Sequence, residues 1–221
     1  MSHDLGLPGV AMSYSWPSAA NPLNYAYDRD SALFARDGLR RMIEEVAKSN
    51  AKNIILVAHS LGSLVTMETL RELAVAQKTR VLNRVGGVVL MSPDIDVDLF
   101  KTQADTIGTL PDPFIIFSSQ KDRALRLISR LTGQTNRLGR LDDVVEIAEY
   151  NITYIDVTAY SEGGLNHFPT ARSAALLKLL GQIPDIEAAL SGDGGRTGLL
   201  PGTVLTVQNV TTLILQPTTS N

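Results

Sequence analysis

The chain has 221 residues, of which 44% are hydrophobic and 19% are charged, and its 20 Lys and Arg stand against 23 Asp and Glu. This composition supports a folded domain with a real core and excludes a disordered or collagen-like chain. The net charge of −3 disfavours a dedicated DNA- or RNA-binding protein, and the absence of Cys excludes disulfides, thiol nucleophiles and thiolate metal sites.

In chain order, short β-rich runs alternate with longer segments of helical periodicity. We expect a short strand at residues 10–15 and then a helix that Asp30 or Ser31 caps and that ends near Lys48. The predicted apolar face of this helix consists of Leu33, Phe34, Leu39, Met42, Ile43 and Val46. Residues 53–59 are almost all apolar, which predicts a strand buried on both faces at the centre of a parallel sheet.

The same alternation continues through the second half of the chain. We expect a helix at residues 63–77, strands at 85–91, 113–118 and 152–157, and a last helix at 169–180. Between the last two of these strands lies a basic helical stretch, residues 123–140, whose charged side is expected to be a solvated face. Repeated strand–helix units predict an α/β fold with a mostly parallel sheet and helices on both faces.

This pattern divides the chain into two regions. Residues 1–190 are expected to form the α/β domain, and residues 191–221 a Gly-rich linker with a β-prone tail. Within the tail, residues 204–215 are expected to form an added edge hairpin or a docking strand.

No targeting or membrane-spanning segment is predicted. The N-terminus lacks a basic region followed by a long apolar stretch, and the longest apolar runs fall far short of the ~20 residues that span a bilayer. A cytoplasmic location is the default expectation. The sequence does not determine the compartment, because a Cys-free chain suits any redox environment.

Ser60 is the candidate nucleophile. It follows the apolar strand, precedes a helix, and has Ala58 and Gly62 two residues away on either side. A serine raised above a sheet on a tight strand-to-helix turn needs small residues at those positions, because the two backbones approach closely there. The backbone N–H of Leu61 would then face the space above Ser60 and donate to an oxyanion.

A serine nucleophile needs a base, and the chain has three His residues. His59 adjoins Ser60 and is expected to face away from it, and His3 lies near the end of the chain. His167 is therefore the candidate base, in a Gly-rich loop after the last predicted strand of the domain.

The third member of a triad is a carboxylate that orients the imidazole. Asp122 follows the strand at residues 113–118 and is the favoured candidate. Asp94 and Asp96 follow the preceding strand and remain rivals, because spacing alone does not separate the three. Asp156 lies at the end of a strand and is expected to be structural.

Three motifs in this order resemble those of a known family. They are Ser-Trp-Pro-Ser at residues 15–18, Ala-His-Ser-Leu-Gly at 58–62 and Pro-Asp-Ile-Asp at 93–96. In these the chain resembles the serine-hydrolase branch of the α/β-hydrolase superfamily, and within it a bacterial clade. The segments 122–125 and 137–139 also resemble the acid-bearing loop of that clade.

The resemblance covers roughly residues 5–180 and implies esterase-like or lipase-like hydrolysis by Ser60, Asp122 and His167, with a small ester or lipid-like substrate. It also implies that the chain begins after a family strand that supplies a second oxyanion-hole N–H. Loss of one such donor can cost ~10²–10³ in kcat. A non-catalytic binding or scaffold protein with the same fold is therefore the alternative.

No cofactor is expected. The chain lacks a phosphate-binding Gly-rich loop between a strand and a helix, and its His and Asp residues show no metal-ligand spacing.

Overall fold

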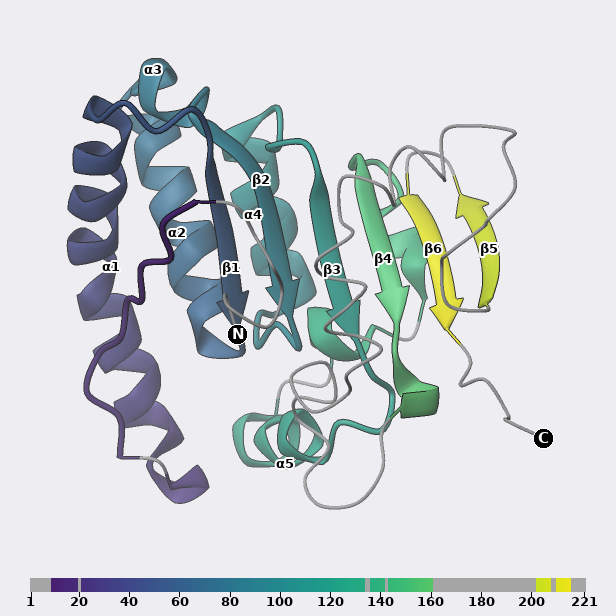
Figure 1. The fold of residues 1–221 in the computed structure, drawn as a ribbon. Helices are drawn as coiled ribbons and strands as arrows, with labels where there is room; N and C mark the ends of the chain where they lie inside the picture. Colours follow the sequence, from purple (N-terminus) through teal and green to yellow (C-terminus); the bar gives the residue numbers. More distant parts are fainter. Residues whose placement is uncertain are drawn as a thin grey trace.

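The computed structural model describes residues 9–19, 21–133, 136–141, 143–160, 202–207 and 210–215. Within them the chain forms a six-stranded sheet in the order β1-β2-β3-β4-β6-β5 (Figure 1). Five strands pair in parallel, and β5 is antiparallel to β6. The strands are β1 (Ile54–His59), β2 (Val85–Met91), β3 (Phe114–Ser118), β4 (Ile152–Asp156), β5 (Gly202–Val207) and β6 (Val210–Leu215). The predicted α/β class with a mostly parallel sheet is confirmed.

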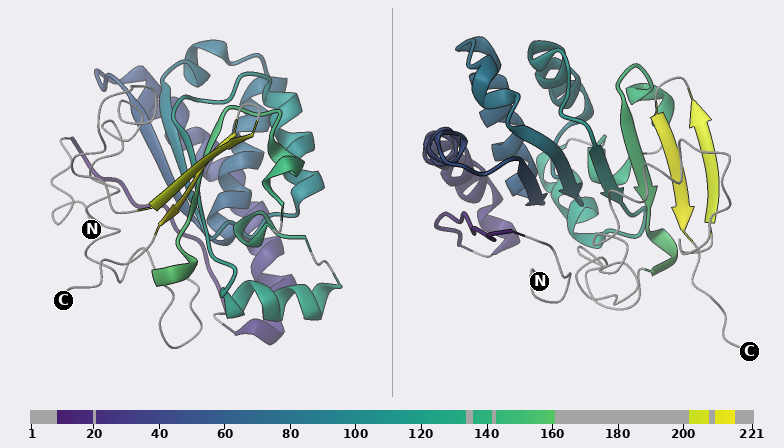
Figure 2. Two further views of the ribbon diagram at one scale, coloured as in Figure 1. Left: turned by 90° about the vertical axis from the view of Figure 1, so that its right-hand side faces the viewer. Right: turned by 45° about the horizontal axis from the view of Figure 1, so that its top comes forward.

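Three helices, α1 (Tyr25–Lys48), α2 (Leu61–Val75) and α4 (Val97–Ile107), form one layer against a face of the sheet (Figure 2). The main hydrophobic core lies between this layer and the strands. A short helix, α3 (Thr79–Leu82), leads into β2, and α5 (Arg123–Thr132) lies beyond the carboxyl ends of the first strands (Figure 1). The helix expected at residues 169–180 lies outside the described residues.

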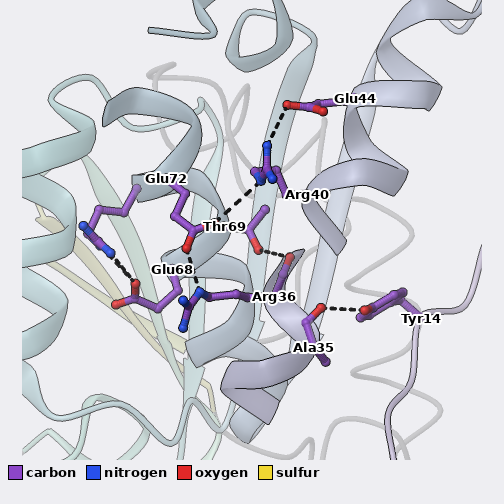
Figure 3. Close-up of polar contacts among 9 residues, drawn as sticks. Tyr14, Ala35, Arg36, Arg40, Glu44, Glu68, Thr69 and Glu72 are labelled. Atoms are coloured by element: carbon purple, nitrogen blue, oxygen red, sulfur yellow. Dashed lines mark hydrogen bonds and ion pairs between the residues drawn. The ribbon is translucent and has the colours of Figure 1, made fainter. Parts of the chain in front are cut away.

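Polar contacts reinforce the packing of α1 on α2 (Figure 3). Arg36 Nε donates to Glu72 Oε1 at 2.6 Å, and Arg40 Nε lies 3.7 Å from the other oxygen of the same carboxylate. Thr69 Oγ1 donates to the Arg36 carbonyl oxygen at 3.4 Å. The carboxylate of Glu72 therefore bridges two turns of α1.

The predicted strand at residues 10–15 is wrong, because this segment packs against helices instead of a strand. Tyr14 Oη donates to the Ala35 carbonyl oxygen at 2.6 Å (Figure 3). The Trp16 ring lies 3.5 Å from the position that a Cβ on Gly62 would occupy. The segment thus crosses α1 and α2, outside the sheet.

The start of α1 also differs from the prediction. The helix begins at Tyr25, so neither Asp30 nor Ser31 caps it. Asp28, in its first turn, accepts a hydrogen bond from Ala19 N at 2.6 Å, and the Tyr25 side chain is buried. These tertiary contacts stabilise an additional turn that has no clear apolar periodicity of its own.

Phe34 does not belong to the apolar face predicted for α1. Its side chain is 88% exposed, whereas Ala32, Leu39 and Ile43 are buried. At 100° per residue these three side chains lie within about 40° of one another, and Phe34 lies on the opposite side of the helix, roughly 200° from Ala32.

The position of β1 contradicts the prediction of a central strand buried on both faces. β1 forms an edge of the sheet within the part of the chain that the structure describes. Ile54 and Leu56 pack against the core, but Ile55 and Val57, which point to the other face, are 53% and 50% exposed. The C-terminal hairpin pairs with β4 at the opposite edge, which confirms the added edge hairpin.

The helices that follow β2 and β3 also differ from the prediction. α4 was not predicted, although Asp96 caps it by accepting from Asp98 N and Leu99 N. α5 ends at Thr132, because Gly133 takes a left-handed conformation (φ 70°). The basic helix therefore does not continue to residue 140.

Candidate active site

Ser60 occupies the sharp turn between β1 and α2. Its backbone has φ 53° and ψ −125°, a conformation that non-glycine residues rarely adopt. Ser60 N donates to the Met91 carbonyl oxygen at 3.0 Å, and Ser60 O accepts from Ser63 N at 2.9 Å and from Asp94 N at 3.3 Å. Contacts on both sides of the residue hold this strained strand–turn–helix geometry, which the sequence predicts.

The residues beside Ser60 are as small as the turn requires. Ala58 is buried, and a Cβ on Gly62 would lie 4.0 Å from the Ala58 Cβ. This is ordinary van der Waals contact, so the strand and the helix approach each other closely at these two positions. Leu61 is the first residue of α2, and its N–H therefore has no acceptor within the helix and lies at the positive end of the helix dipole.

Asp122 lies in the loop after β3 and is fully buried. It caps α5: its Oδ1 accepts from Leu125 N at 3.0 Å, and its own N–H donates to the Ser119 carbonyl oxygen at 3.1 Å. This places a buried carboxylate at the same end of the sheet as Ser60, two strands away. Strands lie about 4.8 Å apart, so the ends of β1 and β3 are separated by roughly 10 Å.

The rival carboxylates have other partners. Asp94 is buried and pairs with Arg137 Nη1 at 3.0 Å, and Asp96 caps α4. Burial, and after it the negative charge of Asp94, raises the pKa of the neighbouring Tyr25 phenol. Asp156 accepts from Thr158 N at 2.8 Å and thus stabilises the turn after β4.

Residues 136–139, which we call the strap, pair with the loop after β2. Leu138 N donates to the Ile95 carbonyl oxygen at 2.9 Å, and Gly139 N donates to the Pro93 carbonyl oxygen at 3.0 Å. Gly139 O then accepts from Ser119 N at 3.1 Å. The strap therefore lies between the Pro-Asp-Ile-Asp segment and the loop that carries Asp122, and sequence reasoning did not detect this pairing.

We call the loop after β3 that carries Asp122 the acid-bearing loop. Backbone hydrogen bonds connect it, through the strap, to the turn at Ser60. On one side, Asp94 N donates to Ser60 O, at 3.3 Å. On the other, Ser119 bonds both to Gly139 in the strap and to Asp122 N. The geometry therefore brings two of the three predicted triad residues, Ser60 and Asp122, into one connected set of loops at the carboxyl end of the sheet.

A family model described as "Alpha/beta hydrolase of unknown function (DUF900)" matches residues 1–183. The chain belongs to this family. The resemblance to the α/β-hydrolase superfamily is thus confirmed, and the C-terminal hairpin lies beyond the matched residues. No curated protein and no solved structure shows a significant match.

The candidate base of this α/β hydrolase, His167, lies outside the described residues, as does His3. His59 is the last residue of β1 and is partly buried. Gln120 N in the acid-bearing loop donates to Thr158 Oγ1 at 2.8 Å. The acid-bearing loop is therefore attached to the start of the segment that leads to His167.

A small cavity of about 90 Å³ lies next to the Asp94–Arg137 pair, and Arg29, Leu64 and Asp96 also line it. Drug-sized ligands occupy pockets of about 300–1,000 Å³, so this space is too small for a ligand of that size. Within the described ranges, no cluster of His, Asp and Glu could hold a metal ion, and none of the helices there has both the length and the hydropathy of a membrane-spanning segment.

Proposed function

We propose that this α/β hydrolase cleaves carboxylic esters through a covalent acyl-enzyme on Ser60. The observation that carries the proposal is the backbone of Ser60, which is held at φ 53° between β1 and α2. A strained residue costs free energy and persists where the surrounding structure enforces it, which is common at catalytic positions. The turn lifts the serine hydroxyl above the carboxyl end of the sheet.

In the proposed reaction, His167 takes the hydroxyl proton as Ser60 Oγ attacks the ester carbonyl carbon. The carbonyl π electrons move to oxygen, and the resulting oxyanion accepts a hydrogen bond from Leu61 N–H. The tetrahedral intermediate then collapses, the C–O bond to the alcohol breaks, and the imidazolium protonates the leaving alkoxide. Water, deprotonated by His167, attacks the acyl-enzyme in the same way and releases the acid.

We assign Asp122 the role of orienting and stabilising the imidazolium. Its loop follows β3, which lies between β1 and β4 in the sheet, and the segment to His167 continues from β4. The order Ser, Asp, His along the chain agrees with that of α/β-hydrolase triads. The engagement of Asp94 with Arg137 argues against Asp94. Asp96 and Asp122 each cap a helix, and the place of Asp122 after β3, the strand beside β4, supports its choice over Asp96.

A fluorophosphonate probe tests the proposal, because it phosphonylates an activated serine without requiring the natural substrate. We expect labelling of the wild-type chain, loss of the label in Ser60→Ala and retention in Ser63→Ala. Ser63 is the control serine, since it lies in the first turn of α2, three residues after Ser60, and is buried. Absence of labelling in folded wild-type protein would contradict the proposal and favour the non-catalytic binding or scaffold protein.

Nitrophenyl esters of increasing acyl length would then define the substrate class. Turnover that depends on Ser60 and rises with acyl length indicates a lipid-like substrate, and turnover confined to acetyl or propionyl esters indicates a small ester. No Ser60-dependent turnover with any acyl length would argue against ester hydrolysis.

A further inference from the structure

The exposed side of α5 carries an unusual combination of residues. Arg123, Arg126 and Arg130 are exposed, and so are two leucines, Leu127 and Leu131, at 39% and 50%. We call these five residues the basic–apolar face. The opposite side of the helix packs inward through Leu125 and Ser129, which are buried. The two exposed leucines are therefore not needed to attach α5 to the domain.

Helix geometry arranges this face as two adjacent stripes. At 100° per residue, the three arginines fall within a sector of about 60°. Leu127 and Leu131 occupy the next sector, which begins about 40° from Arg123. A positively charged stripe therefore runs along the helix, and an apolar stripe lies directly beside it over the C-terminal half.

No carboxylate neutralises this face from within the helix. Asp122 is the single acidic residue among residues 121–132, and it is buried at the N-terminus of α5. Lys121, which is exposed, adds a further cation. In the part of the chain that the structure describes, no salt bridge involves Arg123, Arg126 or Arg130. The net charge of the whole protein is −3, so the positive charge here is a local concentration.

Arginines beside exposed leucines match a partner that presents anionic groups above an apolar layer. A membrane surface with anionic lipids has this layered chemistry, because phosphates lie over acyl chains and an amphipathic helix in the interface contacts both. α5 also lies at the carboxyl end of the sheet, in the direction in which β1 ends before Ser60 (Figure 1). Docking through α5 would turn this end of the molecule toward the lipid.

We propose that the basic–apolar face of α5 docks the protein reversibly onto membranes that contain anionic lipids. The arginines attract the headgroups, and Leu127 and Leu131 insert at the boundary of the acyl chains. This inference does not depend on catalysis, and it holds equally for a Ser60→Ala protein.

Co-sedimentation with vesicles tests the proposal on the full chain. We expect binding to phosphatidylcholine vesicles with about one-third phosphatidylserine, little binding to pure phosphatidylcholine, and weaker binding as salt is raised. Each cation strengthens partitioning about fivefold at low salt, so replacing Arg123, Arg126 and Arg130 with Gln should weaken it about 100-fold. Leu127→Ser with Leu131→Ser should weaken binding without changing its salt dependence.

The matched control replaces Arg41, Lys52 and Arg80, three exposed cations elsewhere on the surface, with Gln. It lowers the net charge by the same amount and should leave vesicle binding close to wild type. Equal losses in both triple variants, or equal binding to both kinds of vesicle, would overturn the proposal. Binding of polyglutamate without binding of anionic vesicles would do the same and would indicate an acidic protein partner. Circular dichroism melting of each variant separates these outcomes from misfolding.

Discussion

Gly139 and Pro93 lie so close together that a Cβ on Gly139 would come within 2.8 Å of both the backbone nitrogen and the backbone oxygen of Pro93. Their hydrogen bond of 3.0 Å needs this approach, because the strap passes directly over the loop after β2. Glycine is therefore required at position 139, because the site leaves no room for a Cβ. The same contact holds the loops of Ser60 and Asp122 in a fixed relation.

Gly139→Ala should destabilise the protein by about 1–3 kcal/mol, the usual cost of forcing extra atoms into a packed site. Urea unfolding measures the change. Gly62→Ala is the matched control, because a Cβ there would meet its neighbours at 3.5 Å and 4.0 Å, which are ordinary contact distances. A Gly139→Ala protein as stable as the Gly62→Ala protein would show that the strap is not tightly packed.

The buried Asp94–Arg137 pair should respond strongly to loss of either partner. Arg137→Met leaves a carboxylate buried without its cation, and we expect a loss of about 3–5 kcal/mol in the free energy of unfolding. Replacing both residues by apolar ones should recover much of this loss. Lys48→Met removes an exposed ion pair with Glu45 and should produce no measurable change.

Asp122→Asn separates the capping role of Asp122 from its proposed catalytic role. Asn caps helices about as well as Asp, so the stability of α5 should be retained. The uncharged amide does not stabilise an imidazolium, and we expect kcat for a nitrophenyl ester to fall about 10³–10⁴-fold. A comparable fall in Asp96→Asn, with Asp122→Asn fully active, would move the triad acid to the loop after β2.

Alkaline pH should unfold the protein partly through Tyr25. Burial and the charge of Asp94 raise the pKa of its phenol above the ordinary value of about 10. The unfolded chain then releases this proton at lower pH than the folded one. The stabilising contribution is complete below pH ~10 and is lost as pH rises toward the folded pKa. Tyr25→Phe should flatten the decline in urea stability above pH ~10, and an unchanged slope would contradict this.

Periodicity predicted β2 and α2 well, the strand from its continuous burial and the helix from its apolar residues at helical spacing. β2 is buried along its length, and its bounds agree with the predicted residues 85–91. The helix α4 was missed although Asp96 caps it and Val97, Phe100 and Ala104 recur at helical spacing. Its signal is weak, since it is short and its buried side includes the polar Gln103.

The turn at Ser60 was predictable because local sterics determine it. The edge position of β1 was not, because the apolar residues Ile55 and Val57 are typical of a strand covered on both sides. The pairing of the strap with the loop after β2 could not be predicted either. Backbone hydrogen bonds between segments more than 40 residues apart leave no periodic pattern in the sequence.

The pairing of β4 with β6 sets a condition on biosynthesis. Ile152 lies beside Val210, so the strand that completes this side of the sheet is translated more than 50 residues after the one it joins. Until β6 has emerged from the ribosome, one edge of β4 has an unpaired row of N–H and C=O groups, the kind of edge on which nascent chains aggregate. The contact is also distant along the sequence, which slows folding. Chaperone dependence during synthesis should therefore end when the hairpin emerges.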